Sequence, residues 1–278
     1  MERRTLGDYR IEGIVGAGRM GVVYRAIDRS GQQVALKVLR EDVAIDDVYR
    51  ERFRREGAML ASLAHPNVIP IHGRGEIDGS LYIATQLTDT TLRNVIQDGP
   101  IPVDIAMAIL VAMADGLDAA HAAGIVHRDV KPANVLMDPG PRVYLTDFGL
   151  ARDPTGIALT APGQVLGTID YMAPELLDGE RVGAATDIYG LACLAVETLT
   201  GTVPYVRDTD AATMYAHIVE PPPSVSERRP ELPKALDDVV AGGMAKDPAD
   251  RPPTAGTLVV EMAEALGRPA PACLAQAA

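Results

Sequence analysis

The sequence predicts an α+β chain in which a small β-rich part with one main helix precedes a larger helical part. Short apolar runs separated by glycine-containing turns fill the first part, whereas segments of helical length and spacing dominate from Leu92 onward. A length of 278 residues with 47% hydrophobic residues allows a large core. We therefore expect two lobes, at residues 1–86 and 87–266, and a Pro/Ala-rich linker or tail at residues 267–278.

Strands are expected in the first lobe where an apolar, β-branched run is bounded by turn residues. The dipeptide Asp78-Gly79 predicts the turn before the last of these runs. Residues 41–63 change to helical spacing, with Phe53 among the residues that face inward. The expected strands are Tyr9–Val15, Val22–Ile27, Gln33–Leu39, Val68–Ile71 and Leu81–Leu87.

Helices are expected in the second lobe where apolar residues recur at helical spacing. Two of these segments end at Gly124 and Gly201, and glycine is the residue that most easily adopts the left-handed conformation after a helix. The second of the two is nearly all apolar, so it should be buried. The expected helices are Asp104–Ala123, Thr186–Thr200, Lys234–Met244 and Thr254–Leu266.

The composition limits the classes of binding partner and the cellular compartment that we expect. A net charge of −12 disfavours nonspecific binding to nucleic acid or anionic membranes, because polyanions repel an acidic protein. The longest apolar stretch, Ile105–Ala114, is about half as long as a membrane-spanning helix requires. No signal peptide is visible, and the two cysteines lack metal-ligand spacing. We expect a soluble, cytoplasmic chain with no nucleic-acid partner and no membrane segment.

The strongest functional signal is the octet at residues 127–134 (HRDVKPAN), which Asp147-Phe148-Gly149 follows about a dozen residues later. Two carboxylates, an amide and an amine therefore lie on two short loops at a fixed separation. These groups are the ones needed to hold Mg²⁺ with ATP and to deprotonate an attacking hydroxyl.

A glycine motif occurs near the start of the chain. Gly16, Gly18 and Gly21 satisfy G-x-G-x-x-G, a spacing that Rossmann dinucleotide sites share. A Rossmann turn opens a helix, but the residues after Gly21 alternate and are β-branched, as in a strand. The pattern favours a strand–glycine–strand flap over phosphates, and an ordinary glycine-rich hairpin is the alternative.

Lys37 lies in an apolar strand beyond this motif, which disfavours a purely solvated surface position. Its expected partner is a carboxylate on the following helix, and Glu56 is the best placed. Glu51 on the same helix is the alternative partner, and Glu56 could instead pair with a neighbouring arginine on the surface.

Taken in order, these motifs resemble the protein kinases over roughly residues 9–266. Lys131, two residues after Asp129, and Thr168 near the Ala173-Pro174-Glu175 motif are typical of serine/threonine rather than tyrosine kinases. Within that class the chain is similar to bacterial Hanks-type kinases of the actinobacterial PknB-like group. The resemblance implies a two-lobed kinase fold, ATP and Mg²⁺ as cofactors with Mn²⁺ able to substitute, and protein substrates that carry serine or threonine.

The resemblance also implies a function for each residue of the octet and its partner motif. Asp129 would be the catalytic base, and Lys131 would reach the transferring phosphoryl group. Asn134 and Asp147 would hold Mg²⁺. Structural contacts are implied for His127 in a stack with Leu60, Ile71 and Phe148, for Glu175 with Arg251, and for Asp187 with the backbone of the catalytic loop.

A nucleotide site is implied as well. Lys37 would contact the α- and β-phosphates, and Glu56 would orient it. Gln86 and Leu87 depart from the acidic and aromatic pair that is common at the hinge. The residues implied around adenine are Val23, Ala35, the gatekeeper Thr85, Gln86, Thr88 and Leu136.

Regulation by autophosphorylation is implied by Arg128, which precedes the base and can bind a phosphate from the activation segment. That segment contains Thr155, Thr160 and Thr168. The Thr168 hydroxyl is better used beside the base, so the expected site is Thr160, with Thr155 as second choice. Modification in trans requires self-association. Solvated loop threonines are the alternative.

Many kinases of this group are receptor-like, with a membrane helix downstream of a cytosolic kinase domain. The Pro/Ala-rich tail suits a catalytic fragment of such a protein, and a naturally short soluble kinase is the alternative. Two other classes of function stay open. A pseudokinase scaffold would lack Lys37, Asp129, Asn134 or Asp147, and all four are present. A small-molecule phosphotransferase usually lacks the Ala-Pro-Glu motif and its distant arginine.

Overall fold

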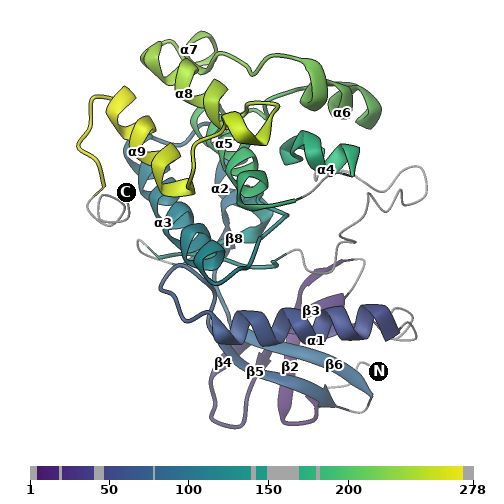
Figure 1. Cartoon of the computed structure of the whole chain (residues 1–278). Helices are drawn as coiled ribbons and strands as arrows, with labels where there is room; N and C mark the ends of the chain where they lie inside the picture. Colours follow the sequence, from purple (N-terminus) through teal and green to yellow (C-terminus); the bar gives the residue numbers. More distant parts are fainter. Residues whose placement is uncertain are drawn as a thin grey trace. The chain divides into compact units, whose positions relative to one another are not determined.

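The computed structural model describes residues 5–18, 21–40, 47–77, 79–138, 142–148, 169–179 and 182–271, apart from the side chains of residues 48, 49, 52 and 56. The chain divides into two compact units, Met1–Asp89 and Thr90–Ala278 (Figure 1). Strands dominate the first unit and helices the second, so the predicted fold class is confirmed.

The described strands of the first unit form one antiparallel sheet in the order β1-β2-β3-β4-β6-β5. The predicted strand at Val68–Ile71 is wrong, because the strand begins only at Ile71 and continues through a polar, glycine-containing stretch to Ile77. This strand lies at the edge of the sheet and is largely exposed, so no apolar run marks it. The strands are β1 Thr5–Leu6, β2 Tyr9–Ala17, β3 Gly21–Ile27, β4 Gln33–Leu39, β5 Ile71–Ile77 and β6 Ser80–Gln86.

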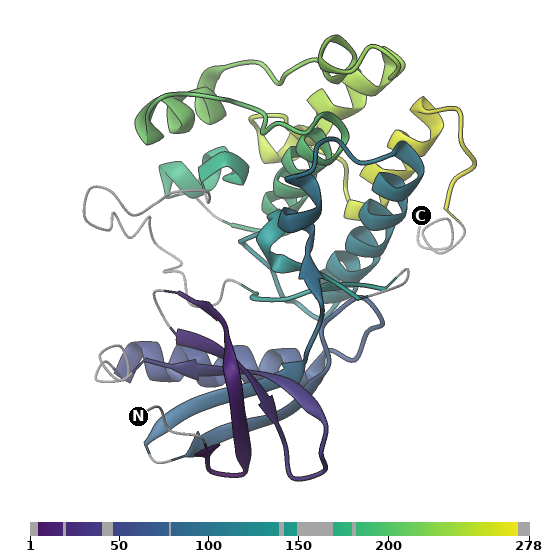
Figure 2. The same ribbon diagram turned by 180° about the vertical axis from the view of Figure 1, so that it is seen from behind.

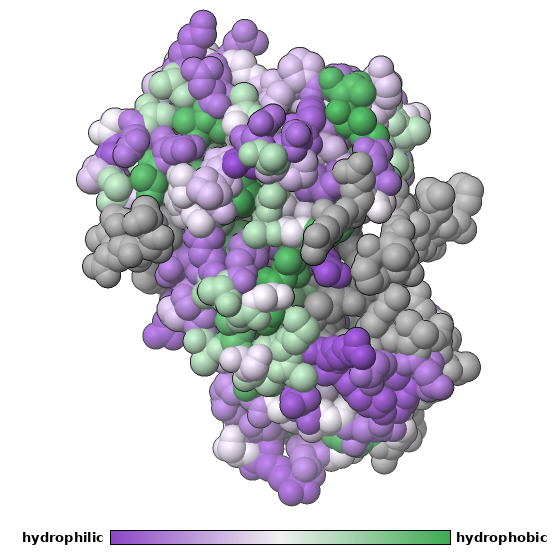
Figure 3. All heavy atoms as spheres, viewed as in Figure 1, coloured by the Kyte–Doolittle hydropathy of each residue, from purple (hydrophilic) through white to green (hydrophobic). Residues whose placement is uncertain are grey.

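Helix α1 (Asp47–Ser62) covers one face of this sheet, as both ribbon views show (Figures 1 and 2). Gly57 allows a close approach, since a Cβ atom there would lie 3.3 Å from Ile83 Cδ1. Hydrophilic side chains, including the exposed Arg54 and Arg55, gather over α1 on its outer side (Figure 3). The buried cluster beneath α1 is Leu39, Phe53, Leu81 and Ile83, and that of the other face is Leu6, Ala26, Val34, Leu36 and Ala84.

The second unit is built around α5, whose residues are almost all buried. Helices α3, α8 and α9 pack against it, and a short sheet β7-β8-β9 lies beside α3. The four helices predicted from the sequence are confirmed, whereas α6 was not expected. The described elements are β7 Thr90–Thr91, α2 Leu92–Ile96, α3 Val103–Ala122, η1 Pro132–Asn134, β8 Val135–Met137, β9 Val143–Leu145, η2 Ile169–Tyr171, α4 Pro174–Asp178, α5 Ala184–Thr200, α6 Asp210–Val219, α7 Val225–Arg228, α8 Ala235–Gly243, η3 Pro248–Asp250 and α9 Ala255–Ala265. Among these helices, none is both long enough and apolar enough to cross a membrane.

The glycines after α3 and α5 provide a test of these helix ends. Gly124 and Gly201 both have φ of +76°, but a Cβ atom at Gly201 would lie 3.2 Å from Pro100 Cδ, whereas Gly124 faces open space. Gly124→Ala should lower the free energy of unfolding by about 1–2 kcal/mol through backbone strain alone. Gly201→Ala should cost roughly 1 kcal/mol more because Pro100 is displaced. Urea denaturation measures both, and equal losses would show that the Pro100 contact has no effect.

Candidate active site

One buried carboxylate fixes the backbone of the predicted catalytic loop. Asp187, 1% exposed, lies in the first turn of α5 and accepts hydrogen bonds from the backbone N–H groups of His127 and Arg128, each at 2.7 Å. His121 of α3 lies 2.7 Å from the same carboxylate. A buried carboxylate with several donors can remain charged. The predicted contact of Asp187 is therefore confirmed, whereas the His121 contact was not predicted.

His127 is fully buried and supports the loop from within. Its Nε2 lies 3.0 Å from the Thr146 carbonyl oxygen, and its Nδ1 accepts the Asp129 backbone N–H at 3.3 Å. These partners fix a neutral imidazole with its proton on Nε2. Burial lowers the pKa of His127, in agreement with this state. The ring packs on Phe148 with centroids 4.4 Å apart, so His127 is a structural residue, as predicted.

Two predicted site residues, Lys131 and Asn134, contact the carboxylate of the predicted base Asp129. Lys131 Nζ lies 2.7 Å from Asp129 Oδ2. Asn134 Nδ2 donates to the same oxygen at 3.0 Å and to the Asp129 carbonyl oxygen at 2.8 Å. The turn η1 makes this arrangement possible, because it folds the chain back between Lys131 and Asn134. Its first residue is Pro132, and proline is favoured at that position.

The hairpin β8–β9 brings Asn134 toward Asp147. Val135 pairs with Leu145, and the Thr146 N–H donates to the Asn134 carbonyl oxygen at 3.1 Å. Since Nδ2 of Asn134 faces Asp129, the side-chain oxygen Oδ1 is the atom of this amide that can bind a cation.

This donor set fits Mg²⁺. A carboxylate oxygen from Asp147 and an amide oxygen from Asn134 would bind a hard cation that completes its shell with phosphate oxygens and water. Among the described residues, no group of three or more His, Cys, Asp or Glu side chains could hold a metal by itself.

Two residues of these loops adopt left-handed backbone conformations. Arg128 has φ of 64° and Asp147 has φ of 54°, the positive values found for described residues other than glycine. Such conformations cost on the order of 1 kcal/mol each and persist where neighbouring contacts impose them. Here Asp187 holds the Arg128 N–H, and the buried Phe148 anchors the chain after Asp147.

In the first unit, the residues predicted to contact the nucleotide share one face of the sheet. Val23 lies opposite Lys37, and Ala35 lies opposite Thr85. Ala35 and Lys37 are two residues apart on β4, so all four side chains point to the same side. They are partly buried, and α1 covers this same face, because Ile83, opposite Lys37, belongs to the cluster beneath the helix.

The glycine motif lies between two paired strands. Gly16 is in β2, Gly21 opens β3, and the Gly18 N–H donates to the Gly21 carbonyl oxygen at 2.9 Å. A Cβ atom at Gly21 would lie 2.5 Å from the Val38 carbonyl oxygen, so no larger residue fits there. A strand, and no helix, follows the motif, which excludes the Rossmann alternative.

Other predicted site residues have less defined surroundings. Glu56 lies in α1, but its side chain is outside the described part of the chain, whereas the alternative Glu51 pairs with Arg55 at 3.0 Å. Gln86 ends β6, its N–H donates to the Pro70 carbonyl oxygen, and its carbonyl oxygen accepts from the Thr85 hydroxyl at 3.4 Å. Thr88 follows β6, and Leu136 lies in β8 of the second unit.

Leu60 and Ile71, predicted to stack on His127, belong to the first unit. Gly149, Thr155, Thr160 and Thr168 lie outside the described residues.

The Ala-Pro-Glu motif is anchored by a buried ion pair. Arg251 donates to both carboxylate oxygens of Glu175, at 2.7 and 2.8 Å, and both side chains are at most 2% exposed. Thr186 also donates to Glu175 at 2.8 Å. Burial raises the pKa of Glu175, but its bonds to Arg251 outweigh burial, and the net shift is downward. The predicted pairing is confirmed.

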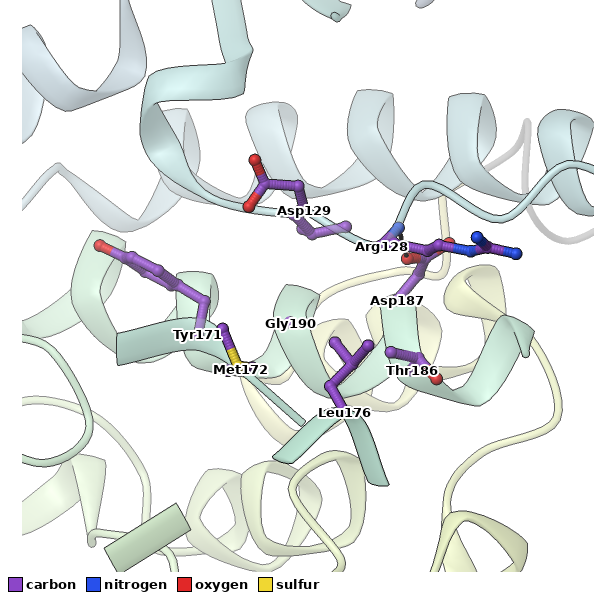
Figure 4. Close-up of a pocket in the computed structure, with 9 residues that line it drawn as sticks. Arg128, Asp129, Tyr171, Met172, Leu176, Thr186, Asp187 and Gly190 are labelled. Carbon is purple, nitrogen blue, oxygen red and sulfur yellow. Dashed lines mark hydrogen bonds between the residues drawn. The ribbon is translucent and has the colours of Figure 1, made fainter. Parts of the chain in front are cut away.

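A pocket lies between the catalytic loop and the residues around η2 (Figure 4). Gly190 of α5 lies at its base, where a Cβ atom would be 3.0 Å from Val130 Cβ and 3.6 Å from the Tyr171 carbonyl oxygen. Gly190 was not predicted as a site residue, because an isolated glycine within an apolar helix carries no functional pattern. The lining residues are Arg128, Asp129, Val130, Tyr171, Met172, Leu176, Thr186, Asp187 and Gly190.

Comparison with known proteins gives one consistent result. The protein kinase domain family matches residues 9–262. The chain is 42% identical over 266 residues to the serine/threonine-protein kinase PknH of Mycobacterium tuberculosis, covering 95% of this chain and 42% of PknH. It is 43% identical over 260 residues to PknE of the same organism, covering 92% of this chain and 46% of PknE. The chain thus spans less than half the length of these relatives.

Solved structures agree with the sequence comparison. A crystal structure of the Mycobacterium tuberculosis PknI kinase domain matches with a TM-score of 0.75 and 35% identity, covering 95% of this chain and 97% of that one. A second structure of that domain gives a TM-score of 0.73 and 34% identity, with 94% and 97% coverage. The resemblance to serine/threonine kinases is confirmed, and the narrower PknB-like assignment stays a prediction.

The anchor of the Ala-Pro-Glu motif can be tested by removing its cation. Arg251→Met should lower the free energy of unfolding by about 3–5 kcal/mol, because the Glu175 carboxylate would be left buried and uncompensated. Arg268→Met is the matched control, since Arg268 pairs with the exposed Asp104 at the surface and should lose at most about 1 kcal/mol. Equal losses in thermal or urea unfolding would contradict the assignment of Arg251.

Proposed function

The chain belongs to the protein kinase family, and we propose that it transfers the γ-phosphoryl group of ATP to serine and threonine hydroxyls of proteins. The observation that carries this proposal is the contact of Lys131 and Asn134 with the Asp129 carboxylate, at 2.7 and 3.0 Å. This arrangement supplies a positioned base beside a cation and an amide. The names of the relatives support the serine/threonine class.

We assign Asp129 as the catalytic base. Lys131 and Asn134 both contact Oδ2 of this residue, and the Asp129 carboxylate is the group assigned to accept the substrate hydroxyl proton. Lys131 neutralises charge at the same point and can reach the transferring phosphoryl group. The Asp187 contacts keep the backbone of this loop fixed while the proton moves.

Asn134 and Asp147 are assigned to Mg²⁺, with Mn²⁺ able to replace it because both accept oxygen ligands. When bound, the metal neutralises phosphate charge and orients the nucleotide. The shared sheet face of Val23, Ala35 and Lys37 is assigned to ATP, together with Thr85, Gln86, Thr88 and Leu136 around adenine and the backbone of Gly16, Gly18 and Gly21 near the phosphates.

Cellular setting and regulation are part of the proposal. The kinase domain would act in the cytoplasm, where ATP is available, whether or not another part of the protein is anchored in a membrane. Its partners would be protein substrates and a second copy of the chain for phosphorylation in trans. Arg128 supports regulation by phosphate, because its buried Nε has no hydrogen-bond partner among the described residues.

The proposed base is tested with labelled ATP and a generic basic protein as substrate. Asp129→Asn should reduce phosphate transfer by about 10²–10⁴-fold while leaving ATP binding and stability nearly unchanged, because Asn is isosteric but cannot accept the proton. Asp104→Asn on the exposed side of α3 is the matched control and should keep full activity. Wild-type protein that transfers no phosphate would indicate a scaffold, and label on small molecules alone would indicate a different phosphotransferase.

The phosphate-orienting pair is tested by a double-mutant cycle. Lys37→Met should abolish activity and Glu56→Gln should remove much of it, with nonadditive effects in the double mutant, because the two side chains act as one unit. Glu51→Gln should have little effect, since Glu51 already pairs with Arg55 on the surface. Additive losses for Lys37 and Glu56, or a large loss for Glu51, would transfer the assignment to Glu51.

Autophosphorylation is expected at Thr160, with Thr155 as second choice and the hydroxyl of Thr168 used beside the base. Phosphorylation adds a charge of roughly −1.5 to −2, which Arg128 can bind. Thr160→Ala should slow substrate phosphorylation several-fold without unfolding the protein. Phosphopeptide mapping of fully active enzyme that finds the segment unmodified would rule out this regulation.

A further inference from the structure

A fully buried histidine on α6 lies outside the machinery described above. His217 is 0% exposed, and its Nδ1 lies 2.8 Å from the hydroxyl of Tyr189 on α5. The ring also meets Tyr205 edge-on, with centroids 4.9 Å apart. Lys246 donates to the His217 carbonyl oxygen at 2.7 Å and to the Tyr205 hydroxyl at 3.2 Å. The last turn of α6 is therefore held through both its backbone and this side chain.

The second ring nitrogen is the unexplained part of this cluster. Nε2 of His217 is buried and has no hydrogen-bond partner among the described residues. Burial lowers the pKa of His217 to about 3, and the Asp170 backbone acts in the opposite direction, as a nearby carbonyl group does. Helix α6, which carries His217, packs on η2, the turn that contains Asp170.

The hydroxyl of Tyr189 decides which nitrogen carries the proton. The Tyr189 hydroxyl lies 2.8 Å from Nδ1, and because burial raises the pKa of Tyr189 the phenol keeps a proton that it can donate to this nitrogen. A neutral imidazole that accepts at Nδ1 has its N–H at Nε2. In that tautomer the buried Nε2–H has no partner among the described residues, and leaving such a group unpaired costs about 1–3 kcal/mol.

Asp170 belongs to η2, and η2 borders the pocket beside the catalytic base. Tyr171 and Met172 line that pocket together with Asp129, and Figure 4 shows them on the side facing the catalytic loop. Helix α6 packs on both η2 and α4. A shift of η2 toward α6 would therefore move one wall of the space beside Asp129.

We propose that His217 is a positioning residue for the protein substrate, which holds η2 in place through a hydrogen bond from Nε2–H to the Asp170 carbonyl group that closes when substrate binds. Tyr189 selects the tautomer that makes this bond possible. The inference rests on the proposed kinase activity, because it concerns the protein-substrate side of the same site. It assigns no chemical step to His217.

The test separates binding of protein from binding of ATP. His217→Phe keeps the ring volume and removes both nitrogens, and it should raise KM for a protein substrate roughly five-fold or more, the equivalent of about 1 kcal/mol. KM for ATP should not change. Tyr189→Phe, which removes only the hydroxyl, should shift KM for protein in the same direction. His217→Gln retains an N–H donor and should restore part of the loss.

Controls and a readout independent of activity complete the design. Tyr215→Phe removes an exposed hydroxyl from the same helix and should leave all constants unchanged. In the wild type, ¹⁵N NMR of the imidazole at neutral pH should show the Nε2–H tautomer, and Tyr189→Phe should abolish that preference. With a protein substrate bound, amide exchange at residues 170–172 should be faster in His217→Phe than in the wild type.

The possible failures are distinct. Inactive wild-type protein would refute the proposed kinase activity on which this inference depends. Active protein in which His217→Phe leaves KM for protein unchanged, or raises both KM values equally, would overturn the assignment of His217. An Nδ1–H tautomer in the wild type would overturn it as well, even if the variants failed to fold.

Discussion

The geometry of the second unit depends on the buried carboxylate of Asp187. Its two oxygens receive the backbone N–H groups of His127 and Arg128, and His121 approaches from α3. Each partner needs the others, because an unpaired buried carboxylate costs several kcal/mol and the left-handed Arg128 backbone would relax without the bond that holds it. These contacts hold the catalytic loop, and with it Asp129, in one position. Rigidity of this kind is what positional catalysis requires.

The same stretch of α5 organises the rest of the site. Thr186 bonds the Glu175–Arg251 pair, and Gly190 packs beneath both the catalytic loop and η2. Tyr189 places its ring 4.9 Å from the Arg251 guanidinium and its hydroxyl on His217. Residues in the first half of α5 therefore contact the catalytic loop, the Ala-Pro-Glu motif and α6. The second half of α5 is apolar and buried, and its packing in the core keeps the first half of the helix in position.

The sequence was informative where chemistry dictates residue type over a short distance. Asp129, Lys131 and Asn134 lie on one turn, so their spacing alone predicts that they can meet, and the structure brings them together. Patterns failed where an element is short or exposed. The strands β8 and β9 have three residues each, too few for a period to emerge, and β5 is a polar edge strand. Helix α6 was not predicted although it is amphipathic, and His217 within it could not be distinguished from any core histidine.

Residues that meet although they lie far apart in the sequence could be predicted only where a repeat connects them. Arg251 and Asp187 were inferred only through the family resemblance, since no periodicity connects residues so far apart in the chain. In the first unit, by contrast, the alternation of side chains along β4 places Ala35 and Lys37 on one face, and antiparallel pairing adds Val23 and Thr85 to it. A two-residue period, once the strand order is known, is thus sufficient to gather the surface that we assign to the nucleotide from three separate strands. The catalytic loop has no such repeat. The geometry of this loop is fixed by hydrogen bonds to α5. The α5 residues that form these bonds are the hardest to recognise in the sequence, because no periodic pattern connects them with the loop.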